Sequence, residues 1–320
     1  MPELPDIVNY VEALRDVLGG ARLEHIAIRH PFLLRTVTPA IEDCRGRPVA
    51  ALHRVGKQIG IELEGEVFVA IHLMIAGRLA WLPRDRRREN VSGADSAGRR
   101  AGGGKGRKGL LGEVEFSTGT LQITEAGTQR RAALRILAGT DALATLDRGG
   151  RDLLACTTGE LAEALRRENH TLKRALTDPR LVSGVGHAYS DEILHAARLS
   201  PFLRTAAISD AQIATLHEAA RTVLSTWTER LRSERAGGFP RKVTAFHPAM
   251  AVHGKYGEPC SICGTPIQRI RYAENESNYC PRCQTDGKVY ADRALSRLLK
   301  DDWPRSVEEL EKLPVPRRAR

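Results

Sequence analysis

The sequence is poor in aromatic residues, in cysteine and in long hydrophobic runs. Aromatic residues make up 5% of the 320 residues, and there are six cysteines. The longest apolar stretch, Val67 to Ile75, is interrupted by His72, whereas a membrane-spanning helix needs about 20 apolar residues. The chain also starts without a basic segment followed by an apolar run. We therefore expect no secretory signal, no membrane partner and a cytoplasmic protein.

Basic residues outnumber acidic ones by 49 to 39, which gives a formal net charge of +10. This excess favours a polyanionic partner, such as nucleic acid or an anionic membrane surface. Much of it lies between Arg84 and Lys108, where nine basic residues accompany three acidic ones and several glycines. A basic, glycine-rich stretch without apolar periodicity indicates a surface insertion (residues 84–109), which either contacts the polyanion or is simply solvated.

The first half of the chain combines one helix with several short strands. Apolar residues recur at helical spacing over residues 5–18, with a proline in the first turn and Gly19-Gly20 at the end. The pattern then changes to β-like runs at residues 26–28, 59–63, 67–73, 114–116 and 121–123. We therefore expect an N-terminal β-sandwich that carries one N-terminal helix, over residues 1–150.

Helical patterns dominate after Asp152. Thr157 with Glu160, and Ser209 with Gln212, have the spacing of capping boxes that start helices. Between them, Gly184-Val185-Gly186 precedes another helix. Free backbone N–H groups at such a start suit a phosphate, although tight helix packing explains the glycines equally well. The predicted fold class is α+β, with a helical domain over residues 151–250.

Four of the cysteines have the spacing of a zinc site. Cys260 and Cys263 form one C-x-x-C pair, and Cys280 and Cys283 form a second pair sixteen residues later. Such pairs hold a tetrahedral structural Zn²⁺ when a hairpin brings them together, and four protein ligands leave no open position for catalysis. Disulfides are the alternative in an oxidising compartment. We expect a zinc finger over residues 251–288 and a helical, basic tail over 289–320.

The N-terminus offers an unusual nucleophile. Removal of Met1 would leave the secondary amine of Pro2 beside the Glu3 carboxyl. An α-amino group titrates near pH 7.7–8.0, so part of it is unprotonated at neutral pH and can form a Schiff base with an aldehyde-like carbon. The simpler explanation of the same residues is a helix start with proline and acid in its first turn.

Together, these motifs resemble the formamidopyrimidine-DNA glycosylase / endonuclease eight (Fpg/Nei) family of bifunctional DNA repair enzymes. The resemblance spans positions 2–283 in order. Its residues are Pro2-Glu3-Leu4-Pro5, Lys57, His72-Leu73 with Gly77, Gly184-Val185-Gly186 with Tyr189 and Glu192, the stretch 252–263, and Tyr279-Cys280-Pro281 with Cys283-Gln284. The family implies a β-sandwich, a helix–two-turns–helix domain, a zinc-bearing β-hairpin and flipping of a damaged base into a pocket.

The resemblance also implies roles for particular residues. Pro2 matches the nucleophile that attacks the sugar C1′, Glu3 matches the proton donor, and Lys57 matches the lysine that contacts phosphate and supports elimination. The implied DNA contacts are His72, Gly186, His187, Asn275, Arg130 and Arg131. The implied partner is damaged or abasic DNA, bound by a monomer that holds one structural zinc ion through Cys260, Cys263, Cys280 and Cys283.

Several of the DNA-contact positions depart from the family pattern. His187 stands where the family has asparagine after its G-x-G, and Asn275 stands where it has arginine before the third cysteine. Ile75 replaces the usual methionine that fills the gap left by a flipped base. The corresponding arginine–phenylalanine motif falls near Glu125–Ala132, which contains no aromatic residue. We therefore expect retained chemistry with altered lesion recognition.

The predicted function is a DNA glycosylase with abasic-site lyase activity in base excision repair. It would excise a damaged, oxidised base through a Schiff base on Pro2, followed by β/δ-elimination. Two other functions remain as alternatives. One is a non-catalytic protein that binds damaged or abasic DNA on the same scaffold. The other is a zinc-ribbon protein-interaction module, which leaves the N-terminal motif unexplained.

Overall fold

The computed structural model describes most of the chain in two compact units. The described residues are 1–84, 109–126, 129–240, 243–244, 247–272, 275–291, 297–298, 303–310 and 312. The first unit comprises Met1–Asp147 with Thr228–Thr244, and the second comprises Arg148–Trp227 with Ala245–Arg320. The predicted basic insertion lies outside the described residues apart from its two ends, as does most of the predicted helical tail.

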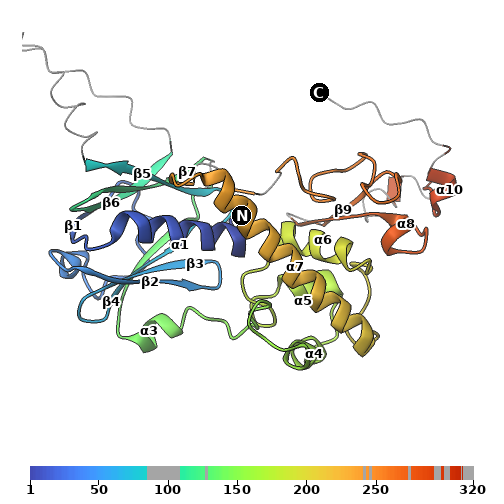
Figure 1. Cartoon of the computed structure of the whole chain (residues 1–320), viewed down its shortest axis with the longest axis horizontal. Helices are drawn as coiled ribbons and strands as arrows, with labels where there is room; N and C mark the ends of the chain where they lie inside the picture. Colours follow the sequence, from blue (N-terminus) through green and yellow to red (C-terminus); the bar gives the residue numbers. More distant parts are fainter. Residues whose placement is uncertain are drawn as a thin grey trace, which may run out of the picture. The chain divides into compact units, whose positions relative to one another are not determined.

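The first unit is a β-sandwich around one helix. Helix α1 (Leu4–Leu18) is followed by two four-stranded sheets. One sheet has the order β1-β6-β7-β5, with β1 (Leu23–Ile28), β6 (Leu110–Phe116), β7 (Gly119–Glu125) and β5 (Gly77–Pro83). The other has the order β2-β3-β4-β8, with β2 (Val49–Val55), β3 (Gln58–Leu63), β4 (Val67–His72) and β8 (Ala133–Ala138). In Figure 1, α1 runs between the labelled strands of the two sheets.

The core of this unit explains why the sequence forms these elements. Ile7, Val11, Leu14 and Leu18 recur on one face of α1 and are all buried in a cluster with side chains from both sheets. Strand β4 is buried from Val67 to Ile71 because it has neighbours on both sides and lies inside the sandwich. The short helices η1 (Ile41–Cys44) and α3 (Thr140–Ala144) belong to the same unit.

Several loops lie together at one end of the sandwich, and the register of the strands shows which loops these are. Gln58, which follows the β2–β3 turn at Lys57, pairs with His72 at the end of β4, and His72 pairs with Ala133 at the start of β8. In the other sheet, Gly77 at the start of β5 pairs with Glu125 at the end of β7. We call this the Lys57 end. It comprises Lys57, residues 73–77, Ala126 with residues 129–132, and the turn at residues 29–34.

The second unit consists of helices followed by a small hairpin. Its helices are α4 (Thr158–Arg166), α5 (Leu172–Thr177), α6 (His187–Ala196), most of α7 (Asp210–Arg235), α8 (Pro281–Gln284) and α10 (Val307–Leu310). The hairpin pairs β9 (Gln268–Tyr272) with β10 (Asn275–Tyr279), from Asn275 opposite Tyr272 to Tyr279 opposite Gln268. It therefore lies between the second and third cysteines of the predicted zinc site, as expected from their spacing.

Most predicted local structure is confirmed. Thr157 and Glu160 form a reciprocal capping box at α4, and Ser209 and Gln212 do the same at α7. One expectation was wrong. The β-like run predicted over residues 67–73 ends at His72, and the chain turns before β5 starts at Gly77. Outside the zinc-site spacing, Cys44 is buried and Cys156 is half-buried next to His217.

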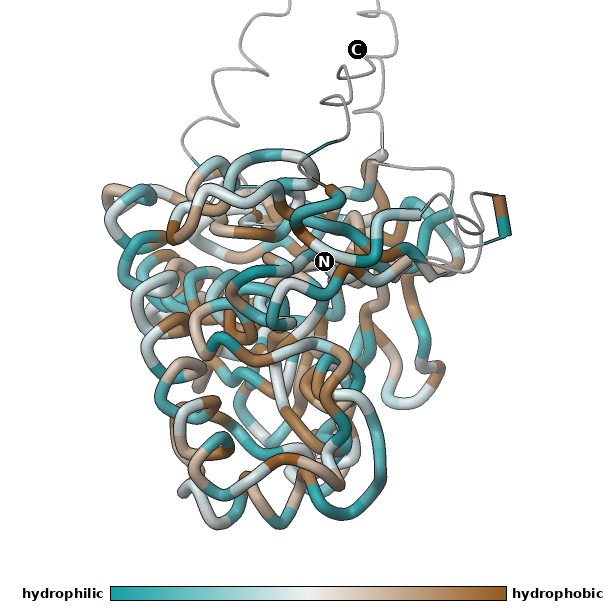
Figure 2. The backbone as a smooth tube through the Cα atoms, turned by 90° about the vertical axis from the view of Figure 1, so that its right-hand side faces the viewer, coloured by the Kyte–Doolittle hydropathy of each residue, from teal (hydrophilic) through white to brown (hydrophobic). Residues whose placement is uncertain are grey.

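Hydrophobic segments are short throughout the described chain. In Figure 2 the brown stretches of the tube are repeatedly interrupted by teal ones. Among the helices formed by described residues, none has the length and apolar character needed to cross a bilayer.

Candidate active site and nucleic-acid interface

The N-terminus is held against the first unit by the start of α1. Glu3 is the N-cap residue, Pro2 is buried, and the Glu3 side chain is 2% exposed. Asp6, three residues on, accepts a hydrogen bond from the Glu3 backbone N–H at 2.9 Å, which is one half of a capping box. The first three residues are therefore fixed in position by the helix that follows them.

Asp6 also anchors a second segment of the same unit. Its Oδ1 accepts hydrogen bonds from the Thr244 backbone N–H at 2.8 Å and from the Thr244 hydroxyl at 3.0 Å. Burial raises the pKa of Asp6 to about 6, against the lowering effect of its hydrogen bonds from Glu3 and Thr244. The carboxyl group therefore ties residue 244 to the N-terminal turn.

This raised pKa predicts a pH-dependent contribution to stability. Because the folded state binds the Asp6 proton more tightly than the unfolded state, stability should fall as the pH rises from about 4 through 6. A pKa of about 6 against the ordinary 3.8 corresponds to about 3 kcal/mol in the free energy of unfolding. Urea unfolding at pH 4.5 and 7.5 should show a smaller pH dependence for Asp6→Asn than for the wild type. Asp141→Asn, which changes an exposed acid of the same unit, is the control. If the free energy of unfolding changed equally between the two pH values in all three proteins, the prediction would be contradicted.

Basic groups surround the N-terminal amine. Burial lowers the pKa of the Met1 α-amine, and the nearby Arg78 and Lys57 lower it further, whereas Glu3 and Asp6 oppose the shift. Burial also lowers the pKa of the Lys57 ammonium, with Glu3 acting in the opposite direction. A low amine pKa increases the fraction of uncharged, nucleophilic nitrogen at neutral pH.

His72 is a neutral member of this group. Burial, followed by the charges of Lys57 and Arg135, lowers its pKa to about 4. The imidazole therefore stays uncharged at neutral pH and offers one N–H donor. Lys57 and His72 lie at the same end of the sheet because Gln58 pairs with His72.

The turn at residues 73–77 has a demanding backbone. Met74 has a φ of +53°, which is unusual for a residue other than glycine, and the Gly77 N–H donates to the Leu73 carbonyl at 2.9 Å. A Cβ atom on Gly77 would lie 2.2 Å from that carbonyl oxygen, so only glycine fits. The turn leaves the Ile75 side chain 51% exposed at the Lys57 end.

The neighbouring loop carries two exposed arginines on a fixed backbone. Glu125, at the end of β7, is 2% exposed, and its Oε2 accepts hydrogen bonds from the backbone N–H groups of Arg131 at 2.8 Å and Ala132 at 2.9 Å. Arg130 and Arg131 themselves are exposed. The Glu125 carboxylate therefore fixes the backbone of the loop that carries the two arginines.

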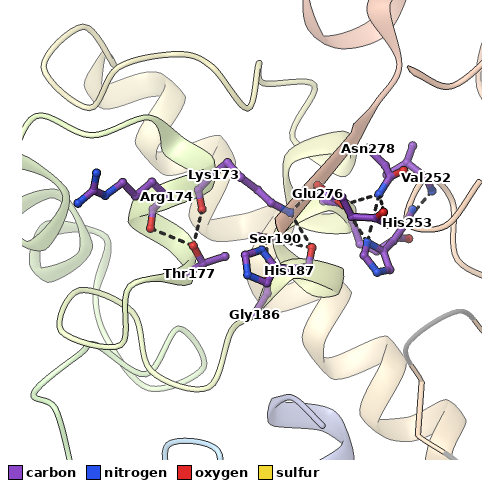
Figure 3. A network of polar contacts seen from close by, with 12 residues as sticks. Lys173, Arg174, Thr177, Gly186, His187, Ser190, Val252, His253, Glu276 and Asn278 are labelled. Atoms are coloured by element: carbon purple, nitrogen blue, oxygen red, sulfur yellow. Dashed lines mark hydrogen bonds and ion pairs between the residues drawn. The ribbon is translucent and has the colours of Figure 1, made fainter. Parts of the chain in front are cut away.

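In the second unit, the predicted phosphate-binding turn starts α6. Gly184 has a φ of +78°, Gly186 is the N-cap, and His187 is the first helical residue. Lys173 on α5 donates from its Nζ to the His187 carbonyl at 2.6 Å and to Asp191 Oδ1 at 2.6 Å. Figure 3 shows Lys173 extending towards His187 and Ser190. This contact holds the first turn of α6 against α5.

Two adjacent acids on α6 bind the segments around the hairpin. Fully buried Asp191 accepts hydrogen bonds through Oδ2 from His253 Nδ1 at 2.8 Å and Asn278 Nδ2 at 3.1 Å; Figure 3 shows His253 beside Asn278. Glu192 accepts the backbone N–H groups of Ala251, Val252 and His253 at 2.7, 2.9 and 2.9 Å.

The pKa values of these two acids are shifted in opposite directions. Burial alone would raise the pKa of Asp191, but Lys173 and His253 hold it below its usual value. Burial raises the pKa of Glu192, partly offset by its three backbone hydrogen bonds.

The four predicted zinc ligands meet at one point. Their Sγ atoms all lie within 4.8 Å of one another, with Cys263 and Cys280 at 3.4 Å and Cys260 and Cys283 at 4.0 Å. A tetrahedral zinc ion with Zn–S bonds of about 2.3 Å places sulfur atoms about 3.8 Å apart. None of the six cysteines, all of which are described, forms a disulfide. The residues therefore fit a structural zinc ion.

The predicted site residues fall into two sets. In the first unit, Glu3, Lys57 and His72 are linked by electrostatic interactions, and Pro2 is buried next to Glu3; Arg130 and Arg131 share the Lys57 end with Lys57 and His72. In the second, Gly186 and His187 start α6, Asn275 starts β10, and the cysteines flank the hairpin. Their functional roles stay predictions.

Sequence analysis missed the residues that hold these sets in place. They are Asp6, Arg78 and Glu125 in the first unit, and Lys173, Asp191, His253 and Asn278 in the second. One signal was available. Adjacent acids at positions 191 and 192, inside a helix whose neighbours are apolar, indicate buried carboxylates that need donors.

Comparison with known proteins identifies the class of the chain. Residues 1–100 match the formamidopyrimidine-DNA glycosylase N-terminal domain, 152–233 its H2TH domain, and 257–285 the zinc finger found in formamidopyrimidine-DNA glycosylase and isoleucyl-tRNA synthetase. An uncharacterized formamidopyrimidine-DNA glycosylase-like protein of Mycobacterium tuberculosis is 40% identical over 151 residues, 47% of this chain and 94% of that protein. The chain therefore belongs to the formamidopyrimidine-DNA glycosylase family.

Full-length relatives agree. The formamidopyrimidine-DNA glycosylase of Thermus thermophilus is 29% identical over 293 residues, 90% of this chain and 100% of the relative. The solved structure of the MutM (Fpg) protein of this organism has a TM-score of 0.71 at 26% identity, over 88% of this chain and 98% of that one. The Lactococcus lactis protein in complex with FAPY-dG-containing DNA, at 22% identity, has a TM-score of 0.73 over 88% of this chain and 100% of that one, and supports the fold. The predicted α+β fold, with a β-sandwich, H2TH domain and zinc-finger hairpin, is confirmed.

Proposed function

We propose that this protein is a bifunctional DNA glycosylase and abasic-site lyase that uses Pro2 as its nucleophile. The observation that carries the proposal is the N-terminal turn itself, where Pro2 and Glu3 are buried at the start of α1 and Lys57 lies close enough to Glu3 to interact with its charge. If Pro2 and Glu3 served only to start a helix, no lysine would be needed beside them. Membership of a family whose named members are DNA glycosylases adds independent support.

The proposed chemistry follows from the two adjacent groups. After Met1 is removed, the Pro2 nitrogen attacks C1′ of the damaged nucleoside, and the base leaves with its electron pair and a proton. Glu3 donates a proton to the sugar ring oxygen, which opens the ring and leaves an iminium between Pro2 and C1′. Loss of a C2′ proton then expels the 3′ phosphate, a second elimination expels the 5′ phosphate, and water releases the enzyme amine.

Lys57 and His72 suit the charges that this chemistry involves. Lys57 is held beside Glu3 and supplies a cation for a backbone phosphate next to the lesion. Neutral His72 donates one N–H to the same backbone. In the second unit, the start of α6 at Gly186 presents backbone N–H groups to another phosphate, with His187 as an additional donor. The partner is therefore damaged or abasic DNA, and one structural zinc ion supports the hairpin.

Borohydride trapping tests the proposal directly. An iminium between Pro2 and abasic DNA is reduced to a stable bond, which mass spectrometry can assign to residue 2. Trapping and strand nicking on abasic DNA are expected for the mature protein. DNA binding without any trapped product would instead support the non-catalytic alternative. A panel of lesion-bearing oligonucleotides, duplex and single-stranded, then identifies the base that is excised.

An exposed aromatic residue at the Lys57 end provides a further prediction. The turn at His30–Leu33 leaves the Phe32 side chain 65% exposed, and the segment after it pairs in parallel with β8 at Leu34 and Leu134. Phe32 therefore lies at the same end as Ile75 and the exposed arginines. Base–aromatic stacking contributes about 1–3 kcal/mol per base. Phe32→Ala should weaken binding to abasic-site duplex by about 5- to 150-fold, as measured by fluorescence anisotropy.

A matched control is available on the same segment. Val37 is 91% exposed but lies beyond the bridge to β8, away from the Lys57 end. Val37→Ala should bind DNA as the wild type does. Equal affinities for all three proteins would show that Phe32 makes no contact with DNA.

A further inference from the structure

The last turn of α6 places a histidine against the zinc-ligand cluster. The Nε2 atom of His195 lies 3.3 Å from the Sγ atom of Cys260, within hydrogen-bond distance for sulfur. Both residues are 3% exposed. His195 is not part of the group of four side chains whose ligand atoms lie close together, which contains only cysteines among the described residues. Its contact is therefore with a ligand of the metal site.

We propose that His195 is a positioning residue for the zinc site, which donates an Nε2–H hydrogen bond to the Cys260 thiolate. A zinc-bound thiolate keeps substantial negative charge and accepts hydrogen bonds, whereas a buried ring N–H needs an acceptor. The bond would orient Cys260 and reduce its reactivity towards protons and electrophiles. It would therefore slow the loss of zinc.

A second contact from the same part of the chain supports this role. Gln284 Nε2 donates to the Leu199 carbonyl at 2.9 Å, and Gln284 Oε1 accepts the Cys280 backbone N–H at 2.9 Å. Leu199 follows α6 closely, so the end of this helix contacts both cysteine pairs: the first through His195 and the second through Gln284. The Leu199 contact uses a backbone group, and the His195 contact depends on the side chain. The latter can therefore be removed by substitution.

Helix α6 itself is well fixed, which makes the geometry of His195 reproducible. Lys173 and the backbone of residues 251–253 bind Asp191 and Glu192, one turn before His195. His195 therefore belongs to a helix whose position is fixed by contacts on two sides. Outer contacts of this kind typically change metal affinity by about 10- to 100-fold when they are removed.

The test compares zinc retention in three variants of the zinc-loaded, full-length protein. His195→Phe keeps a ring and removes the donor, His195→Gln keeps an N–H donor, and His217→Phe removes another buried histidine of the same unit. His217 contacts Thr158 and Leu153 instead of the zinc ligands. Zinc release to a chromogenic chelator is measured as a rate, with zinc content per chain as a second readout.

We expect His195→Phe to release zinc about 10- to 100-fold faster than the wild type. His195→Gln should restore most of the difference, and His217→Phe should release zinc at the wild-type rate even if its melting temperature falls. Wild-type release from His195→Phe would overturn the proposal. So would equal acceleration in His195→Phe and His217→Phe, since that would indicate general destabilisation.

A variant-independent measurement covers the case in which His195→Phe does not fold. During limited alkylation of the wild-type, zinc-loaded protein with iodoacetamide, peptide mass spectrometry should find Cys260 to be modified more slowly than Cys280, which is buried to a similar degree. If Cys260 reacts at the same rate or faster, the proposed protection is absent. Neither experiment depends on glycosylase activity, so the result stands apart from the proposed function.

Discussion

Keeping Met1 attached to Pro2 is expected to abolish borohydride trapping on abasic DNA. An amide nitrogen has no lone pair available for attack, and a tag fused to Met1 also removes the Met1 α-amine that lies near Glu3. Loss of a nucleophile typically lowers rates by a factor on the order of 10³ or more. The comparison uses a fused N-terminal tag against a tag at the C-terminus, with trapping and nicking measured on the same oligonucleotide.

Pro2→Gly tests whether a secondary amine is needed, because glycine still offers a free N-terminal amine. Glycine offers a primary amine without the ring that fixes its direction, and its imine must gain a proton to match the permanent charge of the proline iminium. Trapping should therefore also fall strongly, while affinity for abasic DNA stays close to that of the wild type. Full trapping by the protein with the blocked N-terminus would exclude Pro2 as the nucleophile, and Lys57 would become the amine to examine; full trapping by Pro2→Gly would show only that the pyrrolidine ring is not required.

Glu3→Gln should lower base excision by about 10²- to 10⁴-fold, the range for loss of a general acid or base. The fall in rate caused by Glu3→Gln should be smaller on DNA that already contains an abasic site, because the base has gone and the sugar opens spontaneously. Single-turnover rates on both substrates measure this difference. Glu64→Gln, which changes an exposed acid of the same unit, should leave both rates unchanged. Equal losses on the two substrates would argue that Glu3 acts only by fixing the N-terminal turn.

Much of the fold follows from local patterns in the sequence. Helix α1, the capping boxes of α4 and α7 and the hairpin between the cysteine pairs each rest on residues within a few positions of one another. The segment from His72 to Gly77 was harder. Its apolar residues continue the pattern of β4, and only the close approach of Gly77 to the Leu73 carbonyl shows that the chain turns there.

The site was predictable where chemistry depends on residue type and spacing, as for the cysteine pairs. It was not predictable where a long-range contact determines the environment. Asp6 and Thr244 are 238 positions apart, and Lys173 meets Asp191 across 18 positions, so neither pair produces a local pattern. His195 was missed for the same reason, because Cys260 lies 65 residues away in the sequence.

The clamp formed by Glu192 has a consequence for sequence variation. Its carboxylate binds three consecutive backbone N–H groups, at residues 251 to 253, so recognition there does not depend on which side chains those residues carry. In Glu192→Gln, the side-chain NH₂ group would face one of these backbone N–H groups, and that donor would lose its acceptor. A change of the Ala251 side chain is therefore expected to keep this contact, whereas position 192 should tolerate little except an acid.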